Sequence, residues 1–224
     1  MFDIRRIQVH SFKEFLREYL MIVVGILTAL GLEHLATTQH HNREAEESRQ
    51  RIVAELRANL AEVKDAQAQN SAQIKPVVAA IELLRKEVEQ GVARSEINRR
   101  LLERTRDTRS FSYSWPSLHH EAWDVAVANQ SAGYIDADAL RRYSTAYAAQ
   151  RDSNALGLQG SQALLSSTRL LDAMTDLRLQ RADPVEILKV FTQLATAVTA
   201  AQGNLGELQK ALEAGLEAEP SAPR

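Results

Sequence analysis

The chain has 224 residues, 45% hydrophobic and 25% charged, which is enough apolar material for one folded core and too much for a disordered chain. Its net charge of −2 excludes a general attraction to nucleic acid, and its lack of cysteine excludes disulfides, thiolate metal sites and cysteine nucleophiles. Helix-forming residues dominate, glycine and proline are scarce, and no stretch alternates as a strand does. We therefore predict an all-α protein.

The uncharged run Tyr19–Leu32 is the most apolar segment of the chain. Its fourteen residues cover only ~21 Å of the ~30 Å hydrocarbon core of a bilayer, but apolar neighbours lengthen the run on both sides. We predict a transmembrane anchor over residues 19–38. Two alternatives stay open. One is a cleaved signal peptide, since Ala29-Leu30-Gly31 is a small-x-small triplet, and the other is a buried helix of a soluble protein.

Basic residues are concentrated before this anchor. Four of them lie within residues 1–18, whereas the fifteen residues after Leu32 contain only Arg43. The positive-inside rule keeps residues 1–18 in the cytoplasm as a short segment and exports the body. In a bacterium, that makes an inner-membrane protein with a periplasmic body. Four residues are predicted at the two membrane interfaces: Arg17, Tyr19, Glu33 and His34.

Residues 39–51 are predicted to form a polar helical stalk, because they have almost no apolar face and carry opposite charges four residues apart. Apolar periodicity begins at Ile52, so the transmembrane helix should continue as one long helix from about Ser11 to about Asn70. The next helix should start at Lys75-Pro76 and end at Gly91.

Residues 52–219 are predicted to form the helical bundle domain, and residues 220–224 a disordered tail. A kink or a break is expected near Gly157 and Gly160, where the apolar periodicity slips. Further helix starts are expected at capping residues and prolines: Ser95, Pro116 or Ser117, Asp136 or Asp138, and Asp183-Pro184.

The last helix has the most regular apolar pattern of the chain. Its apolar residues alternate in steps of four and three, the a/d seam of a bundle or coiled coil: Ile187, Phe191, Leu194, Val198, Ala201, Leu205, Leu208 and Leu212. We predict that this helix packs antiparallel along Ile52–Ala66. Pairing with a second subunit would use the same seam.

Aromatic residues gather between Arg109 and Asp124, a stretch that contains both tryptophans. Phe111, Tyr113 and Trp115 alternate with serines, which indicates an extended loop before a helix. Such a loop is typical of a recognition surface, and its alternative role is to close one end of the bundle. Trp123 is predicted to be a core residue. The candidate partner-binding residues are Phe111, Tyr113, Trp115, His119 and His120.

The histidines suggest a metal site as an alternative. His120 and Asp124 lie four residues apart beside His119 and Glu121, and His34 and His41 lie two turns apart. No known metal or catalytic motif is present, so we predict no metal ligands, no cofactor and no catalytic residues. The basic run between Arg94 and Arg109 contains acidic residues as well and is expected to be a solvated helix face.

The chain reads FLREYLMIVVGILTALGLE over Phe15–Glu33 and AWDVAVANQSAGYIDADALRRYSTAY over Ala122–Tyr147. Both segments resemble an uncharacterised group of bacterial single-span proteins with an N-terminal membrane anchor and a helical exported domain of unknown function. The turn Ser131-Ala132-Gly133 departs slightly from the Ser-Gly turn of that group. The resemblance implies this architecture and assigns no functional residue.

These features predict a non-enzymatic, membrane-anchored interaction or scaffold protein whose partners are the lipid bilayer and a protein, either another protein or further copies of the chain. The first alternative is a periplasmic ligand-sensing bundle that acts through a membrane partner. The second is a metal-dependent enzyme around His119, His120, Glu121 and Asp124.

Overall fold

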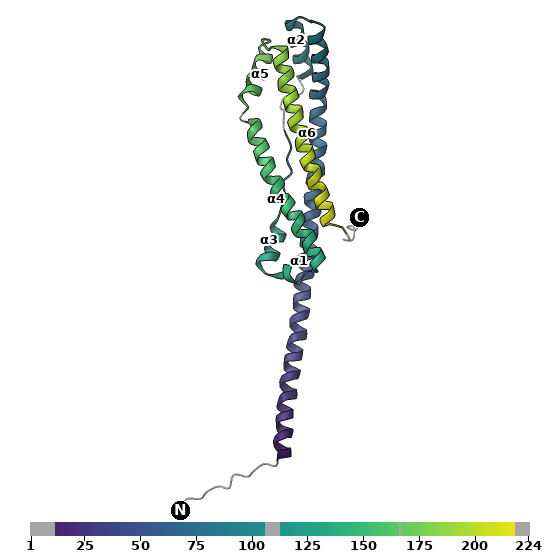
Figure 1. Ribbon diagram of the computed structural model, residues 1–224, viewed down its shortest axis with the longest axis vertical. Helices are drawn as coiled ribbons and strands as arrows, with labels where there is room; N and C mark the ends of the chain where they lie inside the picture. The colour runs from purple at the N-terminus through teal and green to yellow at the C-terminus, as the bar shows by residue number, and fades with distance from the viewer. Residues whose placement is uncertain (1–11, 106–112, 166, 218–224) are drawn as a thin grey trace, which may run out of the picture.

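The computed structural model describes residues 12–105, 113–165 and 167–217 (Figure 1). Every regular element within these residues is helical, which confirms the all-α prediction. In chain order, the elements are α1 (Phe12–Glu89), α2 (Arg94–Thr105), α3 (Glu121–Ala128), the short 3-10 helix η1 (Ser131–Tyr134), α4 (Ala137–Leu165), α5 (Thr168–Arg178) and α6 (Pro184–Gly215).

Helix α1 is a single helix of 78 residues, about 117 Å long at ~1.5 Å per residue. Its lower half stands alone in Figure 1, and the other helices pack around its upper half. The predicted helix start at Lys75-Pro76 is wrong, because Pro76 lies inside α1. A proline there removes one backbone hydrogen bond, and the burial of Val77 and Ile81 on the following turns offsets that loss. The predicted stop at Gly91 is confirmed, since this residue follows the helix at φ +68°.

The lower half of α1 is apolar and uncovered. Between Phe15 and Leu35 it carries twelve large hydrophobic side chains that are each 43% to 67% exposed. This segment is long and apolar enough to cross a membrane. Its exposure distinguishes it from a core helix of the body, whose apolar side chains are covered.

Helix α6 runs antiparallel to the upper half of α1, as predicted. Lys64 Nζ of α1 lies 3.1 Å from Glu213 Oε1, and Gln202 donates from Nε2 to the backbone oxygen of Gln67 at 2.9 Å. Seven of the eight predicted seam residues of α6 are buried, and Ala201 is half-buried. The heptad pattern therefore identified the central packing interface of the body.

The buried apolar residues form two clusters along this pair of helices. The lower cluster joins α1, α3, η1, α4 and α6 around Tyr143 and Tyr147. The upper cluster joins α1, α2, α5 and α6 around Leu84 and Phe191. Trp123 packs half-buried against the lower cluster and stacks on Tyr147 with ring centroids 5.2 Å apart, so its predicted core position is confirmed.

The packed body begins lower on α1 than the predicted start at Ile52. Ala45 and Ser48 are buried, and Ser48 Oγ lies 2.7 Å from Ser131 Oγ of η1. The upper part of the predicted stalk over residues 39–51 therefore belongs to the body. Because small side chains make this contact, no large apolar residue marked it in the sequence.

Two of the predicted helix starts are confirmed. Asp136 accepts hydrogen bonds from the N–H groups of Asp138 and Ala139 ahead of α4, and Asp183 caps α6 with Pro184 at the first helical position.

Two other expected starts are wrong, and so is a break at Gly157 and Gly160. Helix α2 begins at Arg94, one residue before Ser95, and α3 begins at Glu121, beyond Pro116 and Ser117. Helix α4 continues through Gly157 and Gly160. The loop before α3 packs against α1 and α4. This packing explains why α3 starts late and why position 157 of α4 is a glycine.

Candidate functional site

The loop between α2 and α3 is held against α1 by two buried asparagines. Asn59 donates from Nδ2 to the backbone oxygen of His119 at 2.7 Å and accepts from the His119 N–H at 2.9 Å. Asn70 makes the same pair of bonds with Ser114, both at 2.8 Å. Each side-chain amide thus satisfies a backbone N–H and a backbone oxygen that an extended segment would otherwise pair with a neighbouring strand.

The spacing of these two contacts fixes the conformation of the loop. Asn59 and Asn70 are eleven residues apart on α1, about 16 Å at ~1.5 Å per residue. Ser114 and His119 are five residues apart, which covers about the same distance only when the chain is extended at ~3.3 Å per residue. This explains why residues 113–120 are not helical and why α3 starts late.

The aromatic side chains of this loop lie close together. Tyr113 and Trp115 are half-buried, with ring centroids 5.7 Å apart and planes tilted by 40°. The indole of Trp115 lies on α4 at Gly157, where an added Cβ would come within 2.3 Å of Cε2. Gly157 therefore makes room for Trp115, and α4 continues through it. Phe111, the third predicted aromatic, lies outside the described residues.

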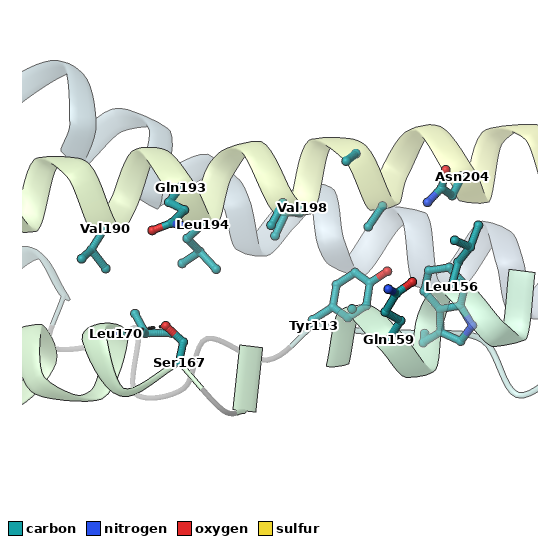
Figure 2. Close-up of a pocket in the computed structure, with 15 residues that line it drawn as sticks. Tyr113, Leu156, Gln159, Ser167, Leu170, Val190, Gln193, Leu194, Val198 and Asn204 are labelled. Carbon is teal, nitrogen blue, oxygen red and sulfur yellow. Dashed lines mark hydrogen bonds between the residues drawn. The ribbon is translucent and has the colours of Figure 1, made fainter. Parts of the chain in front are cut away.

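A groove of about 460 Å³ opens beside these two rings (Figure 2). Helix α6 forms one wall, and α4 and α5 form the other. In Figure 2, Leu170, Val190 and Leu194 lie towards one end and Tyr113, Gln159 and Leu156 towards the other. Along α6 the groove extends from Val190 to Asn204, about 21 Å at ~1.5 Å per residue.

Among the described residues that line the groove, none is acidic or basic. The side-chain hydrogen-bonding groups of these residues are three amides, two hydroxyls and one indole N–H, from Gln159, Gln193, Asn204, Ser167, Tyr113 and Trp115. Burial raises the pKa of Tyr113 to about 12, so its phenol is neutral at physiological pH. The groove is therefore suited to an uncharged, elongated and largely apolar molecule with a few hydrogen-bonding groups.

Some of the groove residues carry a sequence signal that we did not use. Gln193, Ala197, Ala200 and Asn204 each precede a seam residue of α6 by one position, so they form a second stripe with the same four-three spacing. Small and amide side chains at these positions leave open space beside the seam. Leu170 and Val190 line the end of the groove away from Tyr113, and no pattern in the sequence indicated them.

The two predicted histidines lie at the other end of the loop and do not line the groove. Both are exposed, and His119 Nδ1 lies 3.6 Å from Glu121 Oε2. His120 Nδ1 lies 2.8 Å from Asp124 Oδ2, and this hydrogen bond raises the pKa of the imidazole above its ordinary value. Within the described residues, no group of three or more histidine and carboxylate side chains converges as metal ligands do.

The predicted membrane-interface residues lie on the uncovered half of α1. Arg17, Tyr19, Glu33 and His34 are all exposed, and the Tyr19 ring stacks on Phe15 with centroids 6.4 Å apart. His41, once considered with His34, instead stacks on Tyr134 of η1 with centroids 4.0 Å apart. His41 therefore marks the lower end of the body.

The basic run on α2 is only partly a solvated face. Arg100 Nη1 lies 3.0 Å from Oε1 of Glu87, a buried residue of α1, and Arg94 Nε donates to the backbone oxygen of Ala182 at 2.8 Å. These side chains tie α2 to α1 and to the segment before α6. Arg106 and Arg109 lie outside the described residues.

Comparisons with known proteins gave no relative. No family model matches the chain, the search of curated proteins found no similar sequence, and the search of solved structures found no similar structure. The resemblance to a group of bacterial single-span proteins therefore stays a prediction.

Proposed function

We propose that the protein is a single-span membrane protein whose helical body binds an uncharged, elongated ligand in the groove between α4, α5 and α6. The groove carries this proposal, because about 460 Å³ lies within the range of small-molecule sites and its described lining residues supply hydrogen-bonding groups without fixed charges. The protein would act as a binding protein or sensor and not as an enzyme. This proposal favours the ligand-binding alternative over a pure scaffold.

The membrane part of the proposal rests on the uncovered half of α1. Twelve exposed large apolar side chains between Phe15 and Leu35 would have an unfavourable contact with water and a favourable one with lipid. The basic residues before the anchor favour a cytoplasmic N-terminus and an exported body, periplasmic in a bacterium. Protease added to spheroplasts should then remove the body, and a body that stays protected would reverse this orientation.

Ligand binding can be tested with the full chain in nanodiscs and three probes of one length: octanamide, octanoate and octylammonium. Octanamide should raise the melting temperature most, because a charged head group finds no counter-charge among the described residues of the groove. Melting is followed by tryptophan fluorescence, and empty nanodiscs report partition of the probes into lipid.

A matched pair of variants separates groove binding from effects of the lipid. Gly160 lines the groove and Gly203 does not, and an added Cβ meets nothing within 4 Å at either position. Gly160→Leu should remove the effect of octanamide, whereas Gly203→Leu should keep it. Equal responses in both variants would show that the probe acts elsewhere.

A further inference from the structure

The groove is polar at one end and apolar at the other. Figure 2 places the side chains of Tyr113, Gln159 and Asn204 at the same end, which we call the head end. None of these three side chains makes a hydrogen bond to another residue in the described part of the chain. A phenol and two amides can each donate and accept hydrogen bonds, so the head end is open to a polar group of a bound molecule.

The opposite end of the groove, which we call the tail end, is formed by Leu170, Val190 and Leu194. Val190 and Leu194 belong to the upper cluster and are only 4% and 6% exposed, so the floor of the groove here is the apolar core. Ser167 at this end already caps α5, where its side chain accepts from the Leu170 N–H at 3.4 Å. Gln193 supplies the one amide among the described lining residues of the tail end. The tail end therefore suits a hydrocarbon.

The length of the groove sets the length of the molecule that fills it. From Val190 to Asn204 the groove follows fourteen residues of α6, about 21 Å at ~1.5 Å per residue. An extended saturated chain advances by ~1.3 Å per carbon, given ordinary carbon–carbon bond lengths and angles. One chain of about 14–16 carbons, with a small head group at the head end, therefore spans the groove.

We propose that the ligand is a single-chain neutral lipid, whose one acyl or alkyl chain lies along α6 and whose uncharged head group binds between Tyr113, Gln159 and Asn204. This inference rests on the proposed ligand binding in the groove and adds the class of the ligand and its direction. The reverse direction is unfavourable, because the chain would cover the polar side chains of the head end and the head group would lie on Val190 and Leu194.

Fluorescence quenching by bromine can measure this direction with the full chain in nanodiscs. Bromine quenches tryptophan only at short range, and Trp115 lines the groove beside Tyr113, at the head end. The probes are 2-bromododecanamide, with bromine next to the head group, and 12-bromododecanamide, with bromine about 13 Å away at the end of the chain. Unbrominated dodecanamide is the control for quenching, and the Gly160→Leu protein gives the background from probe dissolved in lipid.

Both brominated probes should raise the melting temperature, and 2-bromododecanamide should quench several-fold more than 12-bromododecanamide. If both probes raise the melting temperature but 12-bromododecanamide quenches equally or more, the direction is overturned and ligand binding stands. If neither probe raises the melting temperature, the proposed function fails as well.

Two matched variants of α6 test the position of the head group independently. Asn204 and Gln193 are exposed amides eleven residues apart, three turns along one face of the helix, at opposite ends of the groove. Asn204→Leu should weaken dodecanamide binding by about three- to ten-fold through the loss of a hydrogen bond, whereas Gln193→Leu should leave binding unchanged or strengthen it. The opposite ranking would place the head group at the tail end and overturn the proposal.

Chain length is tested with amides of 16 and 20 carbons, supplied at equal mole fraction in the nanodisc lipid. The 20-carbon amide should bind at least ten-fold more weakly, because each carbon that leaves lipid for water beyond the groove costs about four-fold in affinity. Equal binding of the two amides would overturn the chain length set by the groove.

Discussion

The hydroxyl of Tyr147 donates a 2.5 Å hydrogen bond to Oε1 of Glu55, and the other oxygen of that carboxylate accepts from the N–H of Ala122 at 2.9 Å. One side chain of α1 therefore holds both α3 and α4. Burial raises the pKa of Tyr147 above its usual range, and the hydrogen bond to Glu55 adds to that effect, so the phenol stays protonated as the donor.

Tyr147→Phe should destabilise the body by about 1.5–3 kcal/mol, the usual cost of losing a hydrogen bond to a charged group. Trp123 stacks on this ring, so its fluorescence reports the unfolding transition in urea. Tyr134→Phe provides the matched control, because that tyrosine is exposed, and its free energy of unfolding should change by less than about 0.5 kcal/mol. Equal effects of the two changes would contradict a special role for the Tyr147–Glu55 pair.

Two glycines of α4 should respond in opposite ways to alanine. Gly157→Ala places a Cβ about 2.3 Å from Trp115 and should cost about 1–3 kcal/mol as overpacking. Gly160→Ala meets nothing within 4 Å and should stabilise the helix by up to about 1 kcal/mol. Thermal melts of both variants test this, and the tryptophan emission of Gly157→Ala should shift to the red. A stabilising Gly157→Ala would disprove the packing of Trp115 on α4.

The two asparagines of α1 should control the order of the aromatic loop. Asn70→Ala removes both hydrogen bonds to Ser114, so the Ser114 amide and its neighbours should exchange with deuterium much faster, with about 1–3 kcal/mol lost from stability. Gln69→Ala is the control, because Gln69 accepts from the exposed Ser114 hydroxyl and not from the Ser114 backbone. Unchanged exchange in Asn70→Ala would show that the loop is held by other contacts.

His120 should titrate above its ordinary pKa of 6.5, because Asp124 stabilises the protonated ring. A raised folded-state pKa stabilises the fold below the unfolded pKa, and this contribution disappears as the pH rises through the folded value. The contribution should be small, since the pair is exposed and screened by salt. NMR titration checks the shift, and Asp124→Asn should bring the pKa back towards 6.5. A titration that is the same in both proteins would rule out the pair.

Local patterns in the sequence predicted the parts of the fold that depend on local physics. The heptad seam of α6 and the caps at Asp136 and Asp183 each involve residues a few positions apart, and all three were confirmed. Pro76 and Gly157 were misinterpreted because their meaning depends on distant partners. Burial of the residues after Pro76 keeps α1 helical there, and Gly157 accommodates a tryptophan 42 residues earlier in the chain.

The candidate site was predicted in part. The aromatic loop was recognised from its composition, but its partner helices and the groove could not be, because α6 joins it from far along the chain. One sequence pattern does indicate where the loop packs. Asn59 and Asn70 continue the four-three spacing of Ile52, Leu56, Val63 and Ala66, so two polar residues occupy core positions of α1. A polar residue at such a position needs a buried partner, which here is the backbone of the loop.

The unbroken course of α1 also has a mechanical consequence. From Leu35 to Glu89 the helix continues for 54 residues, about 81 Å at ~1.5 Å per residue, so with the proposed membrane anchoring it would act as a rigid lever arm that pivots in the bilayer. A change of ~20° in tilt would swing its far end sideways by roughly 28 Å. Because bilayer thickness influences tilt, a thinner or thicker membrane would move the groove, which lies below the far end of α1, sideways by roughly one to two helix diameters.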